Sequence, residues 1–425
     1  MKNFKILKYA FMALLLFGLF PPDIFAATPI SLRDLLAEAM SNNPELRALK
    51  ERYGARLARV YYEGALDDPA LKVEMEDLAS KKPYNNGPGN AMQTRYTLSQ
   101  MFPFPGKRSA KEKIAEKEAL VSKAEFESKA VEIAYMVKEA YYAYAYASLA
   151  IKINGEVKEL LSYISSIVQS RYSVGQALQQ DVIKAQFEAA MLTNELIALT
   201  AERDGMEERL KALLDRHADL PLGEPALPKL EKADASAYAF TNASGALNPE
   251  IKAVEYELQA SEMSVDLAKR NYYPDFMVGV APVQRDGRFD TYDFMFQINI
   301  PLWRSKYDSQ TKEAISNAGS ARLRLSAQRN KKAFEIKEAL LKVSAAYKTA
   351  ELYETSLVPQ AEMSFESALK GYQSGKSDFL TLLDTGRSLK KTKIERAGSF
   401  MDYKKKLAML EKAVGAELDN KEGAR

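Results

Sequence analysis

The stretch SRYSVGQALQQDVIKAQ, residues 170–186, decides the fold, because the chain repeats its pattern in KGYQSGKSDFLTLLDTG, residues 370–386. Both stretches contain a Tyr-x-x-Gly turn, at 172–175 and at 372–375, and an apolar run with carboxylates follows each glycine. Glycine suits a turn between two helices because it adopts positive φ without strain. The sequence therefore predicts two helical hairpins of the same kind.

A second pair of matching stretches extends the repeat over most of the chain. Asn-Pro-Glu-Leu at 43–46 and Asn-Pro-Glu-Ile at 248–251 each open a helical stretch. Two short alternating segments, a very long helical stretch, the Tyr-x-x-Gly turn and a shorter helical stretch follow in both cases. We therefore predict two tandem structural repeats, 28–214 and 247–425, joined by an equatorial linker at 215–246 that is rich in Pro, Gly and Ser.

The N-terminus and the composition limit the possible functions. Residues 1–27 have the lysines, the apolar core at 10–20 and the small-residue exit of a secretory signal peptide, so we expect cleavage near Ala26 or Ala27. The chain has no cysteine, which excludes disulfides, thiol catalysis, thiolate metal sites and a lipid anchor on cysteine. A net charge of +3 gives no indication of nucleic acid as a partner. No later apolar run reaches the ~20 residues of a membrane helix.

Four short segments alternate apolar and polar residues, which is the period of a β-strand. They lie at 69–79, 92–102, 275–283 and 291–301. Each has about ten residues, the length of a tilted transmembrane strand. A soluble two-sided sheet has the same alternation, but two hairpins flanked by aromatic residues favour a membrane barrel. The residues expected on its lipid face are Leu71, Val73, Met75, Phe294, Phe296 and Ile298.

The helical stretches fit together by length. Residues 106–171 and 304–372 each cover roughly 100 Å as helix, and Pro359 is expected to kink the second without ending it. One helix leading to the strands and one returning from the turn together match one long helix; the shorter helices are expected at 31–63, 178–214, 248–270 and 379–414. We therefore predict a rod with the strands at one end, both Tyr-x-x-Gly turns at the other, and the linker at the waist.

One copy of such a chain cannot satisfy its own sheet. Four strands leave two unpaired edges, and an open sheet edge cannot face lipid. The strands must therefore close with those of identical neighbours in a ring-shaped oligomer. The alanine-rich run 314–327 suits close helix packing in the wall, although high helix propensity accounts for alanines equally well.

The chain resembles the outer-membrane efflux protein family, the TolC-like exit ducts of export systems. The stretches that carry the resemblance are 31–48, 102–111, 170–186, 273–280, 298–303 and 358–384, in that order. The resemblance implies a mainly α protein with a small membrane β-barrel contribution, a homotrimer whose twelve-stranded barrel stands in the outer membrane above an α-helical periplasmic tunnel. It implies a passive duct for solutes. The sequence has no His-based dyad, no phosphate-binding glycine loop and no metal-ligand spacing, so we expect no enzymatic activity, no cofactor and no metal site. The implied partners are a periplasmic adaptor, an inner-membrane pump such as an RND transporter, and outer-membrane lipid.

The resemblance also assigns roles to residues near the two turns. The adaptor-docking tip would comprise Tyr172, Ser173, Val174, Gly175, Tyr372, Gln373, Ser374 and Gly375. The tunnel constriction would comprise Gln180, Asp181, Tyr372 and Asp384. The carboxylates of Asp181 and Asp384 would form rings that attract cations. The alternatives are a helix-hairpin turn without a partner and solvated acids on a helix surface. Ser377 and Thr381 stand where the family can have an arginine and an aspartate, so the salt bridges of a closed gate are not predicted.

The substrate is the least constrained prediction. The corner at 103–108, Pro-Phe-Pro-Gly-Lys-Arg, resembles the heavy-metal efflux branch of the family, but a tight turn with a cationic residue accounts for it as well. The lone His217 lies in the linker, where we expect it to be solvated, and the methionines are scattered without a soft-metal cluster. Because of the corner at 103–108, we expect metal ions as substrates before drugs or organic solutes. The alternative function is a periplasmic coiled-coil scaffold or adaptor without a pore.

Overall fold

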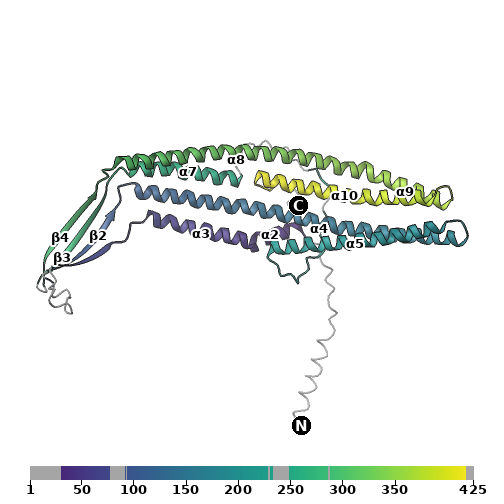
Figure 1. Cartoon of the computed structure of the whole chain (residues 1–425), viewed down its shortest axis with the longest axis horizontal. Helices are drawn as coiled ribbons and strands as arrows, with labels where there is room; N and C mark the ends of the chain where they lie inside the picture. The colour runs from purple at the N-terminus through teal and green to yellow at the C-terminus, as the bar shows by residue number, and fades with distance from the viewer. Residues whose placement is uncertain are drawn as a thin grey trace, which may run out of the picture.

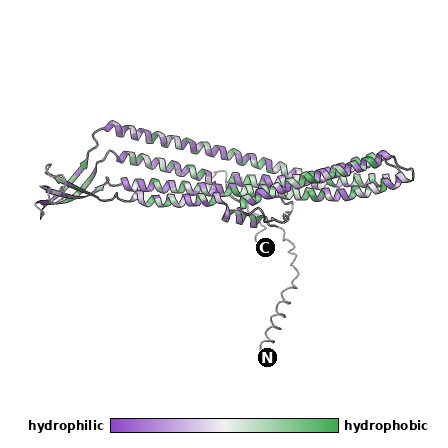
Figure 2. Ribbon diagram, turned by 60° about the horizontal axis from the view of Figure 1, so that its bottom comes forward, coloured by the Kyte–Doolittle hydropathy of each residue, from purple (hydrophilic) through white to green (hydrophobic). Residues whose placement is uncertain are grey.

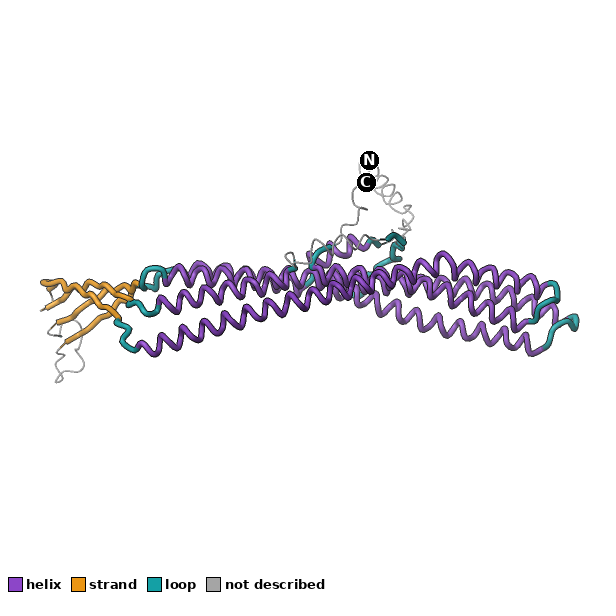
Figure 3. The backbone as a smooth tube through the Cα atoms, turned by 90° about the horizontal axis from the view of Figure 1, so that it is seen from above, coloured by secondary structure: helices purple, strands orange, loops and turns teal. Residues whose placement is uncertain are grey.

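The protein is a long rod with a sheet at one end and two helical hairpin turns at the other (Figure 1). The structure, a computed structural model, describes residues 30–76, 91, 93–227, 230–232, 248–285 and 288–417. The predicted signal peptide at 1–27 lies outside the described residues, as do positions 77–79 and 92 of the predicted strands and most of the linker beyond 232. The predicted separation of the strands from the two glycine turns is confirmed (Figure 3).

Each half of the chain contributes two strands and a set of long helices. The first half forms α2 (Leu32–Asn42), α3 (Pro44–Gly64), β1 (Ala70–Glu76), β2 (Gln93–Phe102), α4 (Lys107–Ser173) and α5 (Gln179–Leu214). The second half forms α7 (Pro249–Arg270), β3 (Asp275–Arg285), β4 (Arg288–Asn299), α8 (Arg304–Leu352), η2 (Tyr353–Leu357), α9 (Val358–Gln373) and α10 (Phe379–Val414).

Two interruptions modify the expected helices. The stretch 31–63 forms two helices because Asn43 caps α3: its side-chain oxygen accepts hydrogen bonds from two amides of the first turn, and Pro44 occupies the first helical position. Pro359 does not end its helix, as expected. The chain makes the π-helical turn η2 just before it, which accommodates a residue that has no N–H and whose ring crowds the preceding turn.

The helices form one curved layer whose order matches the order of the strands. The sheet is antiparallel with the order β1-β2-β3-β4. In the layer, α4 packs between α3 and α7, and α7 packs between α4 and α8; toward the turns, α5 and α10 take the places of α3 and α7. One copy therefore forms a strip, with β1 and β4 at the two edges of its sheet.

Two asparagines join the short helices end to end. The Asn43 side chain donates to the Leu213 carbonyl at 3.0 Å, where α5 ends and α3 begins. The Asn248 side chain donates to the Ala413 carbonyl at 2.9 Å, at the same joint between α10 and α7. Both side chains are buried, and both also cap the helix that they begin. Each pair of short helices thus runs beside one long helix, as the length arithmetic predicted.

The repeat is visible in ion pairs as well. Lys129 on α4 contacts Glu45 at 2.7 Å and Glu132 at 3.1 Å. Lys332 on α8 makes the corresponding contacts to Glu250 at 2.7 Å and Glu335 at 2.9 Å. The clamp between a long helix and the start of a short one is therefore made twice with the same residue types.

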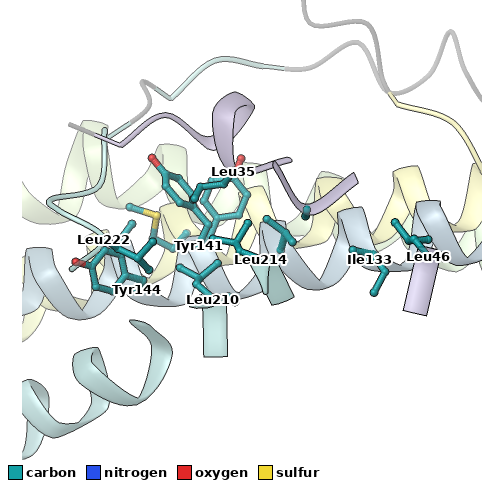
Figure 4. Packing of buried hydrophobic residues seen from close by; sticks show 14 residues of the cluster. Leu35, Leu46, Ile133, Tyr141, Tyr144, Leu210, Leu214 and Leu222 are labelled. Carbon is teal, nitrogen blue, oxygen red and sulfur yellow. The ribbon is translucent and has the colours of Figure 1, made fainter. Parts of the chain in front are cut away.

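The main hydrophobic core lies at the waist, where α2 and the linker cover α4 (Figure 4). Leu35, Leu210 and Leu214 are fully buried around Tyr141. The Tyr141 hydroxyl donates to the Ala226 carbonyl at 2.7 Å, and the Tyr144 hydroxyl donates to the Gly223 carbonyl at 2.7 Å. Burial raises the pKa of Tyr141 to about 12. The described part of the linker is thus strapped to α4 by hydrogen bonds.

Candidate functional site

The sheet presents one apolar face to its surroundings. Strand register places Leu71, Leu98, Val280 and Phe294 in one row across all four strands. All four side chains are exposed, and Phe294 is 86% exposed. The six residues that we predicted for the lipid face lie on this side and are all exposed in the single copy. Figure 2 shows both hydrophobic and hydrophilic residues in the strands.

The opposite face of the sheet carries the charged side chains. Lys72 and Glu74 pair along β1. Arg95 on β2 contacts Glu76 of β1 at 3.1 Å and Asp293 of β4 at 3.2 Å. A sheet with one apolar and one charged face is typical of a membrane barrel, in which one face meets lipid and the other meets water.

The corner at 103–108 ties the sheet to three helices. Lys107 is nearly buried and contacts the Asp275 carboxylate at 2.8 Å, while the Phe104 amide donates to the same oxygen at 2.7 Å. Arg108 donates twice to the Gly64 carbonyl, at 2.9 and 2.6 Å. Gly106 has φ = 90°, and a Cβ there would lie 2.0 Å from the Arg270 guanidinium. The motif therefore fixes the junction of β2, β3, α3 and α7; the sequence indicated a tight turn here but not these partners.

The two Tyr-x-x-Gly turns have the same backbone. Gly175 and Gly375 have φ of 74° and 75°. In the first turn the Gly175 amide donates to the Tyr172 carbonyl at 3.0 Å, and the next amide reaches Arg171 at 2.8 Å. The second turn makes the equivalent bonds at 3.1 and 2.8 Å. Both are Schellman ends of a helix, which explains why both have glycine at this position.

The side chains of the two turns are not equivalent. Tyr172 is 41% exposed, whereas Tyr372 is 5% exposed and packs beside Phe379. The Arg171 guanidinium lies 4.9 Å from the centre of the Tyr372 ring and donates to the Tyr372 carbonyl, which joins the first hairpin to the second. Burial raises the pKa of Tyr372, with a smaller contribution from Asp181. The Tyr372 side chain is therefore engaged inside the protomer, and the other residues predicted for the docking tip are exposed.

The residues predicted for the constriction lie on three helices, with Tyr372 on α9 and the other three residues on α5 and α10. Gln180 and Asp181 are in the first turn of α5, with Gln180 exposed and Asp181 half-buried. Asp384 lies on α10, exposed and 3.7 Å from Arg387. Thr381, at the position of the missing aspartate, is a helix-start residue whose amide donates to Asp378 at 2.8 Å. This bond is among those that lower the pKa of Asp378, after a hydrogen bond from the Thr381 side chain.

Sequence reasoning missed two ion pairs that connect the hairpins near these acids. Arg387 on α10 holds Glu188 on α5 with two hydrogen bonds of 2.9 and 2.5 Å. One turn further on, Lys390 contacts Glu195 at 2.8 Å. The partners are about two hundred positions apart, so only their equivalent places in the two repeats could have indicated them.

The described residues hold no group of three His, Cys, Asp or Glu side chains that could bind a metal ion. His217 is solvated, as expected, and lies 3.2 Å from Asp219. Within the part of the chain that the structure describes, no helix is both long and apolar enough to cross a membrane.

The sequence model of the outer membrane efflux protein family matches residues 35–216 and 242–416. The chain belongs to the outer membrane efflux protein family. The cobalt-zinc-cadmium resistance protein CzcC of Cupriavidus metallidurans is 23% identical over 88% of this chain and 87% of its own length. The toluene efflux pump outer membrane protein TtgF of Pseudomonas putida is 24% identical over 94% and 85%.

Solved structures of outer membrane proteins and channels share the fold. The outer membrane protein VceC of Vibrio cholerae superimposes with a TM-score of 0.76 at 18% identity, over 91% of this chain and 97% of VceC. The predicted TolC-like fold and efflux-channel function are therefore confirmed, and nothing supports the alternative of a periplasmic adaptor.

Proposed function

We propose that this outer membrane efflux protein is a homotrimeric exit duct, in which three copies close a twelve-stranded barrel and a helical tunnel. The observation that carries the proposal is that each free edge of the sheet continues into a free edge of the helical layer on the same side of the chain. β1 and the α3–α5 column form one edge, and β4 and the α8–α9 column form the other. All neighbouring strands are antiparallel, so β1 and β4 run in opposite directions. The β4 strand of one copy would therefore pair with the β1 strand of the next copy in the same antiparallel way.

Both helical edges expose apolar side chains that a neighbouring copy would cover. On α8 and α9 they are Ile315, Leu323, Phe334, Leu341, Leu352 and Met363. On α3 and α5 they are Leu57, Tyr61, Tyr62, Ile183, Phe187, Met191 and Ile197. The members of the first set are separated by about two or three helical turns, so they share one side of the column. Unpaired columns of this kind favour association with a second copy.

Docking of a periplasmic adaptor at the hairpin tips is part of the proposal. The first turn offers Val174 and Tyr172, and the second offers Gln373 and Ser374, all exposed at the far end of the rod. Nothing in the chain has the motifs of a nucleotide-hydrolysing enzyme, so an inner-membrane pump would supply the energy. We further propose that segment 1–27 is a signal peptide that directs export and that the mature protein carries no lipid anchor. We also propose that the linker at 215–246 separates the two structural repeats.

Heavy-metal ions are the first candidate cargo. The relative CzcC is named for resistance to cobalt, zinc and cadmium, and the corner at 103–108 points to the same branch. Organic solvents are the second candidate, because TtgF is named for toluene efflux at a similar identity. Deleting the gene and measuring tolerance to cadmium and to toluene in the same cells distinguishes them.

The duct itself is tested by assembly and conductance. Purified protein should have the mass of three chains and should form conducting pores in planar bilayers. Leu341→Glu should abolish the trimer, because it places a charge on the apolar column of α8, whereas Leu227→Glu, on the waist linker, should leave it intact. A water-soluble monomer without pore activity would contradict the proposal.

A further inference from the structure

Arg95 on β2 connects three strands on the polar face of the sheet. Its Nη1 lies 3.1 Å from Glu76 Oε1 on β1, and its Nε lies 3.2 Å from Asp293 Oδ2 on β4. Register aligns Arg95 with Glu74 of β1 and with Val283 of β3. The Asp293 contact therefore reaches past β3 to the strand beyond it.

The side chain of Arg95 lies flat on the sheet. Adjacent strands are ~4.8 Å apart, so a contact from β2 to β4 spans about twice that distance along the surface. On the same face of β3, Ala281 and Val283 are 3% and 1% exposed. Ala281 is opposite Asp293 in the register, and its small side chain leaves room for the guanidinium to cross.

This face lines the lumen if the apolar face meets lipid, so the inference rests on the proposed function. Three copies would then bring three Arg95 side chains to one level of the barrel. An arginine without partners would extend toward water, whereas here two carboxylates draw it back along the wall. The set of Arg95, Glu76 and Asp293 has a net charge of −1 in each copy, which favours cations in the lumen.

We propose that Glu76 and Asp293 hold Arg95 against the barrel wall, and that these three residues set the width and the charge preference of the barrel lumen. Each ion pair is partly exposed and individually weak, so removing both carboxylates should be needed to release the arginine. The duct would then admit cations and neutral solutes in preference to anions at this level.

The test measures charge preference and width separately in reconstituted trimers. Reversal potentials in a KCl gradient near 0.1 M, where the Debye length is ~10 Å, report charge preference. Neutral polymers of graded size, added only on the sheet side, report barrel width. Glu76→Gln/Asp293→Asn should shift the reversal potential toward anion preference and exclude polymers that enter the wild-type barrel. Adding Arg95→Gln to that pair should restore polymer entry.

Controls separate this inference from the proposed duct. Asp215→Asn/Asp219→Asn removes two carboxylates at the waist and should change neither measurement. Unchanged reversal potential in the Glu76→Gln/Asp293→Asn trimer would overturn the charge role, and unchanged polymer entry would overturn the holding of Arg95. A wild-type protein that forms no pore would instead contradict the proposed function.

Discussion

At the scale of single residues, glycines in the tip have opposite requirements. Gly386 lies inside α10 and faces an apolar cavity of about 40 Å³ beside Phe365. A Cβ there would sit 3.5 Å from the Phe365 ring, an ordinary contact. Gly386→Ala should therefore stabilise each copy by about 0.5–1 kcal/mol from helix propensity, plus the gain from filling the cavity. Gly205→Ala on α5, where no atom lies within 4 Å, isolates the propensity effect. The midpoint of thermal trimer dissociation should rise more for Gly386→Ala than for Gly205→Ala.

Gly175 has the reverse requirement because its φ is 74°. A β-branched side chain there costs roughly 1–2 kcal/mol, whereas asparagine tolerates the left-handed conformation. Gly175→Val should distort the tip and impair coupling to the adaptor while the trimer assembles normally, since the turn is remote from the strands. Gly175→Asn should retain most activity. Tolerance of the cells to the exported solute measures coupling, and full tolerance with both Gly175→Val and Gly375→Val would refute the docking role.

At the scale of elements, the attachment of the linker to α4 should respond to alkaline pH. We call this attachment, made by the hydrogen bonds of Tyr141 and Tyr144, the waist strap. The pKa of Tyr141 in the folded protein is raised from 10.0 to about 12 because burial disfavours the phenolate. The contribution of Tyr141 to the free energy of unfolding is therefore fully present below pH 10. Roughly 3 kcal/mol of that free energy is lost as the pH rises through 12. Tyr141→Phe should weaken the waist at neutral pH, through loss of the bond to Ala226, but should flatten this part of the pH dependence.

Limited proteolysis between pH 8 and 12 measures the release of the linker from α4, because residues 215–227 of the linker lie on the surface of the rod (Figure 1). Tyr163→Phe, an exposed position on α4, serves as the control and should follow the wild-type profile. An identical alkaline transition in Tyr141→Phe would show that another group controls the waist.

How much of these elements the sequence could predict depends on the range of the interactions. Strands and long helices followed from alternation and length, because both are local patterns. The break at Asn43 was also local, and Asn-Pro is its signal. The buried state of Tyr372 and the pairing of Arg387 with Glu188 could not be predicted, since they depend on how the two hairpins pack, not on either hairpin alone. The repeat hid this difference, because aligned residues were expected to have equal surroundings.

At the scale of the whole molecule, the rod separates two charged levels. The residues Glu76, Arg95 and Asp293 lie in the sheet, and Asp181 and Asp384 lie near the hairpin turns at the opposite end. In a trimer the two tip acids would form two rings of three carboxylates, and such rings favour cations. Selectivity would then be set twice along one path, by groups too far apart for direct interaction.

That separation makes the tip assignment testable in the assembled channel. Asp181→Asn/Asp384→Asn should reduce cation preference or change single-channel conductance, because it would remove two carboxylates per copy from the proposed tunnel constriction. Arg387 would keep its two bonds to Glu188, so the packing of α5 and α10 should persist. Combined with Glu76→Gln/Asp293→Asn, the shifts in reversal potential should add, since mutations at sites well over 10 Å apart behave independently. An unchanged pore after Asp181→Asn/Asp384→Asn would place these acids outside the tunnel. A combined shift far from the sum would mean instead that the sheet and the tip change shape together.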